Sequence, residues 1–222
     1  MPDVNDSSRR TYSSAVREES ARRTRQAIVQ AAARLFAERG YTAASLREVA
    51  HAAGVARPTV TAVFGSKPAL LRQILNEALA GDDEPVPVAD RPWFAPVWQA
   101  SDQASTLEAY AGVCTLIGAR SARMFEIVRR AAGESAEIAE LWSTLCRNRR
   151  AGAAMVVGKI IESGPLRAGV SRDQAIDSLW VLNDPTLYGA LVLDSGWPED
   201  HHRRWLATQM RAALLPGDPH RR

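Results

Sequence analysis

The sequence predicts an all-α protein, and two observations support this fold class. In almost every patterned segment, apolar residues recur every three or four positions, which is the period of an α-helix. No segment alternates apolar and polar residues in the way that is typical of a half-buried strand. We therefore expect helices along the whole chain, separated by turns that contain glycine or proline.

The composition fits one or two globular domains that stay inside the cell. Of the 222 residues, 46% are hydrophobic and 24% are charged, which allows a sizeable core and excludes wholesale disorder. No stretch is apolar for long enough to cross a bilayer, and the N-terminus lacks the apolar centre of a secretory signal, so we expect a cytoplasmic protein. Cys114 and Cys146 lack metal-site spacing and are interpreted as reduced core residues, with a disulfide or redox role as the alternative.

Three parts are expected along the chain. The run "DDEPVPVADRP" after Gly81 breaks the helical pattern, so we place a boundary there. Residues 1–20 are expected to form a flexible arm, residues 21–80 a small basic domain and residues 81–222 a larger helical domain. Residues 1–80 contain 12 Lys and Arg against 7 Asp and Glu, whereas the remainder contains 16 against 18. This asymmetry favours a polyanion-binding head, with a merely solvated basic arm as the alternative.

Short helices are expected in the basic domain. The first has an apolar stripe from Ile28 to Phe36. Ser45–Glu48 has the capping-box pattern, in which each side chain bonds the other residue's free backbone N–H, and it opens the second helix. The third is expected over Arg57–Phe64, with a weak start because Ala56 has no capping oxygen.

The larger domain should contain longer helices. A second capping box, Ser171–Gln174, opens a helix that Pro185 should bend, and Gly164-Pro165 ends the helix before it. The expected helices cover residues 107–117, 124–128, 138–160, Arg172–Asp194 and Glu199–Leu215.

The pair of short helices joined by Ala53-Gly54-Val55 has the pattern of a helix-turn-helix. In that motif the second helix enters the major groove of DNA with its first residues toward the base edges. Arg57 can form a forked hydrogen bond to guanine, and a proline or threonine methyl can contact thymine. Short helix pairs also occur in ordinary bundles, so this pattern alone leaves both interpretations open.

The order of residues over a longer stretch is more specific. The segment "AIVQAAARLFAERGYTAASLREVAHAAGVARPTVTAVFGSKPALL" resembles the TetR family of transcriptional regulators. It contains, in order, a helix, a Gly-aromatic turn, a Ser-capped helix, an Ala-Gly-Val turn, a recognition helix, Phe and Ser-Lys. The resemblance covers about a fifth of the chain and implies a DNA-binding regulator.

The resemblance also implies which residues contact DNA. Ser45 and Lys67 would bind phosphates, and the base-edge candidates are Arg47, Arg57, Pro58 and Thr59. Two positions depart from the family pattern, because the family usually has tyrosine where this chain has Thr61, and histidine or tyrosine where it has Val63. Thr61 keeps a hydroxyl with a shorter reach and Val63 has no polar group, so weaker binding that depends more on the arm is expected.

The N-terminal arm has two open interpretations. It is either a solvated tail or a segment in which Arg22, Arg23 and Arg25 add salt-sensitive contacts to the minor groove or backbone of DNA.

All six tryptophans lie beyond residue 90, in the larger domain. Most of them should pack in a core, but TetR-like proteins hold a small-molecule effector inside this domain, in a largely apolar pocket. The candidate ligand residues are Trp93, Phe94, Trp98, Tyr110, Phe125, Trp142, Trp180 and Asn183, with Asp184, Thr115 and Arg120 as further polar groups that could orient a ligand.

A homodimer on a palindromic operator is expected, because one recognition helix spans only a few base pairs. The last two helices carry more apolar side chains than one stripe requires, and the candidate interface residues are Leu187, Leu191, Trp205 and Met210. The alternative is that both helices close the core of the monomer.

We expect no catalytic site, metal site or cofactor. His201 and His202 stand beside Glu199 and Asp200, but adjacent residues on a helix do not face one ligand, so we interpret the histidines as solvated. The alternative function is a helical small-molecule-binding or enzymatic protein whose helix-turn-helix is purely structural. As a DNA-binding regulator, the protein is expected to be a repressor that its ligand releases from DNA.

Overall fold

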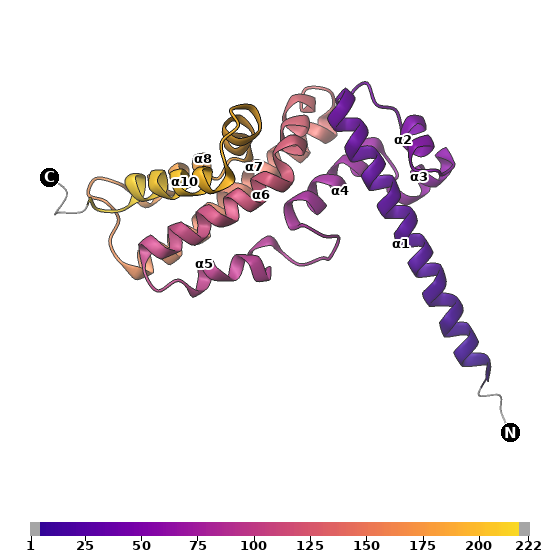
Figure 1. Ribbon diagram of the computed structural model, residues 1–222, viewed down its shortest axis with the longest axis horizontal. Coiled ribbons are helices and arrows are strands. Elements are labelled where there is room, and N and C mark those ends of the chain that lie inside the picture. The colour runs from indigo at the N-terminus through magenta and orange to yellow at the C-terminus, as the bar shows by residue number, and fades with distance from the viewer. Residues whose placement is uncertain (1–4, 218–222) are drawn as a thin grey trace. The chain divides into compact units, whose positions relative to one another are not determined.

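The structure, a computed structural model, describes residues 5–217, with side chains from residue 16 onward. Within that range all regular elements are helical, as Figure 1 shows, so the predicted fold class is confirmed there. The elements are α1 (Asn5–Arg39), α2 (Leu46–Ala52), α3 (Arg57–Phe64), α4 (Lys67–Ala80), η1 (Val88–Asp90), η2 (Pro92–Phe94), α5 (Ala95–Gln99), α6 (Gln103–Ala131), α7 (Ala136–Ser163), α8 (Arg172–Leu182), α9 (Pro185–Tyr188), the π-helical η3 (Gly189–Asp194) and α10 (Glu199–Leu214). None of the helices in the described part is both long and apolar enough to span a membrane.

The chain forms two compact units that divide between Ile74 and Leu75, inside α4. We call the part up to Ile74 unit 1 and the part from Leu75 unit 2. The boundary expected at Gly81 stays a prediction. Helix α1 continues back to Asn5, through most of the expected arm. The flexibility of that arm stays a prediction, and its residues 1–4 lie outside the described part of the chain.

Unit 1 is built around the apolar stripe of α1. Ile28, Ala32 and Phe36 are fully buried, as their helical spacing predicts. Helix α2 packs on α1, and α3 packs on α2. The Phe36 ring lies 5.4 Å from the ring of Tyr41, just beyond the end of α1, which closes the core at that end. This small core holds the helix-turn-helix in place.

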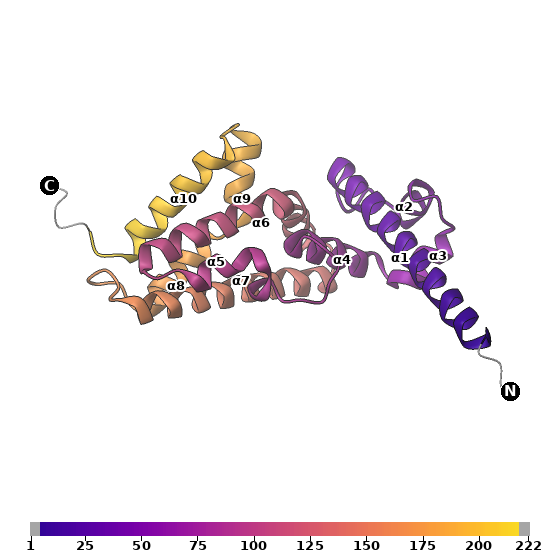
Figure 2. The same ribbon diagram turned by 60° about the horizontal axis from the view of Figure 1, so that its bottom comes forward.

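Unit 2 is a helical bundle around α6 and α7, which lie side by side in both ribbon views (Figures 1 and 2). Helix α10 packs along α6, α8 packs on α7 and α10, and α5 covers another part of α6. The largest side chains of this core are Phe94, Leu107, Tyr110, Val156, Val157, Ile160, Ile176, Leu179, Leu206, Met210 and Leu214.

Helix α6 corrects the sequence prediction of two separate helices over 107–117 and 124–128, because the structure has one continuous helix there. The small residues between those segments are a packing surface and do not break the helix. A Cβ on Gly118 would lie 2.5 Å from the Cβ of Tyr188, so this glycine lets α9 approach α6 closely. Nearby, the buried Ser121 hydroxyl donates to the carbonyl of Ile117 at 2.7 Å.

The segment 172–194 also differs from the single bent helix that was expected. Helix α8 ends at Leu182, and Asp184 then caps a new short helix by accepting a hydrogen bond from the Thr186 N–H at 2.9 Å. Pro185 takes the first position of that helix, where its missing N–H costs no hydrogen bond. The proline therefore begins a helix here, and the chain continues as the π-helical η3.

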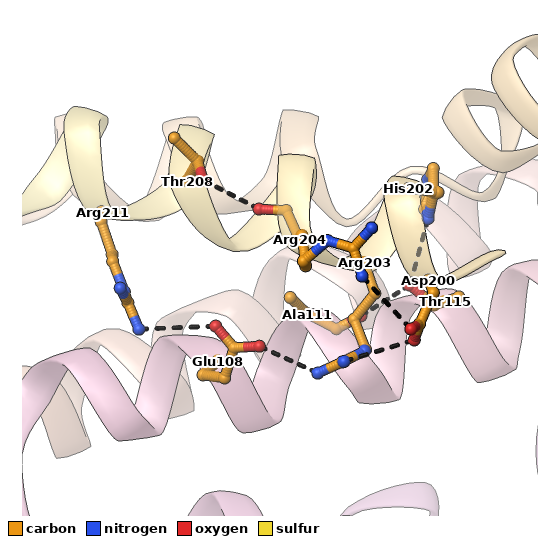
Figure 3. Close-up of polar contacts among 9 residues, drawn as sticks. All are labelled: Glu108, Ala111, Thr115, Asp200, His202, Arg203, Arg204, Thr208 and Arg211. Atoms are coloured by element: carbon orange, nitrogen blue, oxygen red, sulfur yellow. Dashed lines mark hydrogen bonds and ion pairs between the residues drawn. The ribbon is translucent and has the colours of Figure 1, made fainter. Parts of the chain in front are cut away.

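Polar contacts fasten α10 to α6 (Figure 3). Glu108 on α6 accepts hydrogen bonds from Arg203 at 2.9 Å and from Arg211 at 3.4 Å, two turns apart on α10. Further along, the Thr115 hydroxyl oxygen lies 3.1 Å from Nδ1 of His202. These contacts fix the register of the last helix on the bundle.

Candidate nucleic-acid interface and effector site

The turn between α2 and α3 sets the angle at which these helices meet. Gly54 has a φ of +68°, in the left-handed region that favours glycine. The Val55 N–H donates to the carbonyl of Ala50 at 3.0 Å and so closes α2. The Ala-Gly-Val order therefore forms the predicted helix-turn-helix.

Helix α3 buries one edge and exposes the rest. Val60 is 1% exposed and packs inward, whereas Arg57, Pro58 and Thr61 are exposed and Thr59 is half-buried. Arg47 is exposed on α2. The predicted base-edge residues thus lie on two adjacent helices, and all of them except Thr59 are exposed. The contacts of these residues with bases stay predictions.

Ser45 and Glu48 form the predicted capping box. The Ser45 hydroxyl oxygen accepts from the Glu48 N–H at 3.2 Å, and Glu48 Oε2 accepts from the N–H of Ser45 at 2.8 Å. Hydrogen bonds from the backbone and hydroxyl of Ser45, assisted by the charge of Arg39, hold the pKa of the Glu48 carboxyl below its usual range. The local order of α2 is therefore explained by residues a few positions apart.

Lys67 lies at the first position of α4, where a phosphate contact is predicted. Its ammonium donates to the carbonyl of Thr42 at 3.3 Å and lies 4.2 Å from the centre of the Tyr41 ring. A charge packed on an aromatic face keeps one orientation at little entropic cost. The side chain is therefore preorganised beside the Gly-Tyr turn that follows α1.

The departures from the family pattern have visible consequences. The start of α3 has no side-chain cap, because Ala56 supplies no oxygen, as predicted. Thr61 and Val63 are both exposed on α3, so the sites usually occupied by tyrosine and histidine carry only short side chains here.

The three arm arginines have partners within the protein. Arg22 and Arg23 lie 3.1 and 2.9 Å from the Glu19 carboxylate, one turn earlier on α1. The guanidinium of Arg25 lies 4.8 Å from the centre of the Phe64 ring at the end of α3. Sequence reasoning missed this contact, and only the helical phase of α1 could have indicated that Arg25 and Ile28 lie near one face.

A family model described as bacterial regulatory proteins, tetR family, matches residues 28–74. These residues contain the helix-turn-helix, the capping box and Lys67. Residues 28–74 are therefore similar to the helix-turn-helix region of TetR-family transcriptional regulators. This match indicates DNA-binding regulation of transcription, and TetR-family regulators are not enzymes.

Solved structures of other TetR-like regulators share the fold over most of this chain. FadR, a fatty acid degradation regulator from Bacillus halodurans, is 19% identical with a TM-score of 0.67, and the alignment covers 89% of this chain and 97% of FadR. NalD from Pseudomonas aeruginosa, the secondary repressor of the MexAB-OprM multidrug efflux pump, is 21% identical with a TM-score of 0.66 and coverages of 88% and 98%. A transcriptional regulator from Saccharomonospora viridis in complex with choline has 21% identity, a TM-score of 0.66 and coverages of 86% and 97%. No curated protein matches the sequence.

Five of the eight predicted effector residues lie around one arginine of unit 2. Arg149 on α7 lies 5.3 Å from the Phe125 ring centre and 5.8 Å from that of Trp180. Its side chain is 13% exposed and pairs with Asp184 at 2.9 Å. Three further candidates join through hydrogen bonds or ring contact. Asn183 accepts from Arg149 at 3.2 Å and donates to the Tyr110 hydroxyl at 2.9 Å, and Trp142 packs edge-on against Phe125 at 5.1 Å.

We call this set, Tyr110, Phe125, Trp142, Arg149, Trp180, Asn183 and Asp184, the Arg149 cluster. Burial raises the pKa of the Tyr110 hydroxyl far above its usual range and that of the neighbouring Cys114 thiol to about 12, so both groups stay protonated. The Trp180 indole Nε1 is buried without a hydrogen-bond partner among the described residues. The sequence analysis missed Arg149, although its position four residues after Leu145 and four before Ala153 places it on the apolar stripe of α7.

The remaining three effector candidates form a separate aromatic group. The rings of Phe94 and Trp98 stack at 5.1 Å, and Trp93 lies 6.3 Å from Phe94. Arg120 covers the Trp93 ring at 5.4 Å and donates to the carbonyl of Ala80 at 3.4 Å. Trp98 also lines a surface hollow of about 400 Å³ with Met155 and Lys159, among others.

His202 corrects the expectation of two solvated histidines, because it is only 2% exposed while His201 is exposed. The Thr115 hydroxyl donates to the carbonyl of Ala111 at 2.9 Å, so its oxygen must accept from Nδ1–H of His202 (Figure 3). Nε2 is then a buried acceptor without a partner in the described part of the chain. Burial lowers the pKa of His202, and Glu199 opposes that shift.

The four interface candidates separate into two groups. Leu187, Leu191 and Trp205 are half-buried within the single chain. Met210 is fully buried in the core of unit 2, so it contributes to the protomer's own packing. Val181 and Leu193, on α8 and η3, are 58% and 43% exposed and extend the apolar surface.

Proposed function

We propose that this regulator is a cytoplasmic repressor that leaves its operator when a small, largely apolar ligand binds in unit 2. The observation that carries the proposal is the Arg149 cluster, in which five of the eight predicted ligand residues lie together beside the interruption between α8 and α9. The proposed DNA contacts are those of Ser45, Arg47, Arg57, Pro58, Thr59, Thr61 and Lys67.

The Arg149 cluster supports regulation because its hydrogen bonds and ring contacts form only when four helices are in place. Tyr110 and Phe125 come from α6, Arg149 from α7, Trp180 from α8, and Asp184 caps α9. A ligand that enters must replace contacts of a partly buried ion pair, and leaving such a network only partly satisfied is costly. We therefore expect the helices to move to positions in which both the ligand and Arg149 have polar partners. A ligand shifts the DNA-binding equilibrium by its difference in affinity for the two arrangements.

The named structural neighbours support a small organic effector and suggest probes. One is in complex with choline, another regulates fatty acid degradation, and NalD represses a multidrug efflux pump. Choline and dodecanoate are therefore suitable first probes, because both combine an apolar part with a charge that Asp184 or Arg149 can pair.

The operator assay uses a duplex selected from a random library by the full-length protein. Fluorescence anisotropy should show binding of that duplex and its release as a probe is added. The variant Trp180→Ala should keep DNA binding but need a higher probe concentration. If a probe binds the protein by calorimetry yet leaves the operator affinity unchanged, ligand-released repression is contradicted.

The working unit is proposed to be a homodimer formed by Arg172–Asp194 and α10 on a palindromic operator. The exposed Val181 and Leu193 support this, because a two-fold pairing would bury them. Leu191→Glu should give a soluble monomer with much weaker operator binding, measured by sedimentation velocity and anisotropy. A parent protein that sediments as a monomer at micromolar concentration would exclude the dimer.

A further inference from the structure

The recognition helix α3 is held in unit 1 by few side chains. Val60 is its one fully buried residue among the described side chains, and Phe64, at its last position, is half-buried. An eight-residue helix is not stable alone, so its direction is set by what it packs against. Val60 fixes the middle of the helix, and Phe64 is the anchor at the far end from the base-edge residues.

Arg25 on α1 covers that second anchor. Its guanidinium carbon lies 4.8 Å from the centre of the Phe64 ring, within the range of a cation–π contact. Arg25 is half-buried, and within residues 16–217 it has no carboxylate partner. Arg22 and Arg23, by contrast, are exposed and are paired with Glu19. The described contact of Arg25 is therefore with the end of the recognition helix.

We infer that Arg25 is a positioning residue for base recognition, acting through Phe64, and is not a phosphate contact. Its guanidinium clamps the C-terminal end of α3 against α1 and so limits the tilt of the helix. Arg57 lies seven positions before Phe64 on the same helix, and the tilt of that helix decides whether the Arg57 guanidinium lies in the plane of a base edge. Bidentate contacts of arginine with guanine tolerate little angular error. This inference rests on DNA binding by α3, which the proposed function also requires.

The two roles for Arg25 have different signatures in solution. A phosphate contact adds affinity for all duplexes alike and raises the salt dependence of binding by about one unit of slope. A positioning contact adds affinity mainly where bases are read. Its removal should lower the discrimination between specific and non-specific duplexes and leave the salt slope unchanged.

The test uses the full-length protein, a duplex selected from a random library by the parent, and a scrambled duplex of the same length. Anisotropy titrations over a range of KCl concentrations compare the parent with Arg25→Gln, Phe64→Leu and the double variant. Arg22→Gln is the matched control, because it removes the same charge from the same helix and leaves Phe64 untouched.

Arg25→Gln should bind the selected duplex about three- to tenfold more weakly than Arg22→Gln does, with less than about a twofold difference on the scrambled duplex. Both variants should have the same salt slope. The double variant should be no weaker than Phe64→Leu, because the arginine has nothing left to clamp.

Equal weakening on both duplexes with a reduced salt slope, or additive effects in the double variant, would overturn the inference. If Phe64→Leu does not fold, Phe64→Met replaces it, and the discrimination ratio of Arg25→Gln decides the question by itself. A parent protein that selects no duplex contradicts DNA binding as a whole. A parent that selects one, with unchanged discrimination in Arg25→Gln, contradicts the role of Arg25 alone.

Discussion

The contacts within unit 1 and within unit 2 differ in how far apart their residues lie along the sequence. In unit 1 the helix-turn-helix is defined by residues a few positions apart, such as Ser45 with Glu48 and the glycine turn after α2. In unit 2 the polar contacts that join the helices connect Tyr110 with Asn183, 73 positions apart, and Thr115 with His202, 87 positions apart.

This difference fits the tasks that we propose for the two units, DNA reading by unit 1 and ligand sensing by unit 2. Local contacts form the helix-turn-helix of unit 1, and the packing of Phe64 against Arg25 on α1 limits how far its recognition helix can tilt. Buried polar contacts between distant helices make unit 2 depend on how those helices are placed, and a ligand can change that placement. The predictions below test whether the contrast in energetics is real.

Breaking the Arg149 cluster should have the largest effect. Arg149→Met leaves the Asp184 carboxylate partly buried without its partner, and we expect a loss of about 3 kcal/mol in the free energy of unfolding of unit 2. All six tryptophans lie in unit 2, so urea unfolding followed by tryptophan fluorescence reports on this unit. The control Arg39→Met breaks an exposed pair with Glu48 in unit 1, and far-UV circular dichroism should show a cost of less than about 1 kcal/mol for it. Similar losses in the two variants would remove the contrast between the units.

The close approach of α9 to α6 gives the next largest effect. Gly118→Ala should destabilise unit 2 by about 1 to 3 kcal/mol, because the added Cβ would lie 2.5 Å from that of Tyr188. Gly152→Ala on α7 is the matched control, since nothing lies within 4 Å of its added Cβ, and it should stabilise the helix by up to about 1 kcal/mol. Both values come from the same fluorescence assay. If Gly118→Ala leaves the stability of unit 2 unchanged, the close approach of α9 to α6 is not needed for that stability.

Removing the helix cap at Ser45 should cost less stability than these changes, and only in unit 1. Ser45→Ala removes the side-chain oxygen that satisfies the Glu48 N–H, and the expected cost is about 1 kcal/mol. Far-UV circular dichroism should show the loss, whereas the tryptophan transition of unit 2 should not move. Ser45→Thr keeps the oxygen and should behave like the parent. A shift of the fluorescence transition in Ser45→Ala would show that the units do not unfold separately.

The pH response of His202 should be the smallest effect. Burial lowers its pKa in the folded protein below the unfolded value of 6.5, so the unfolded chain binds the proton more readily. The contribution of His202 to stability is therefore complete above pH 6.5, and it falls as the pH drops from there to the lower folded pKa. His202→Gln should flatten this part of the stability curve, and His201→Gln, at an exposed position, should not. Identical curves for the parent and His202→Gln would show that the buried ring does not titrate in this window.

The sequence was sufficient where structure depends on neighbours along the chain. The capping boxes at Ser45 and Ser171, the Gly54 turn and the bounds of α3 are each defined within about four residues, and all were predicted. The weak start of α3 at Ala56 follows from one missing oxygen, so it was predicted as well.

The predictions were wrong or incomplete where a residue's role depends on a distant partner. The segment between residues 117 and 124 was not expected to be helical, and its Gly118 packs against Tyr188. His202 was expected to be solvated, but α10 packs on α6 and buries it. Arg149 was missed because a charged residue on an apolar stripe is explained only by Asp184 and Asn183, which lie more than one helix away. Individual base and ligand contacts depend on molecules that the sequence does not contain.

The central claim is that α3 reads DNA bases while Lys67 supplies affinity that does not depend on base sequence. The most direct measurement is the affinity of Arg57→Ala and Lys67→Ala for the selected and scrambled duplexes over a range of salt concentrations. Arg57→Ala should lose about 1 to 3 kcal/mol on the selected duplex and little on the scrambled one, whereas Lys67→Ala should weaken both alike and reduce the salt slope by about one. Parent-like binding of both variants to both duplexes would contradict the assignment of this helix-turn-helix as the DNA-reading surface.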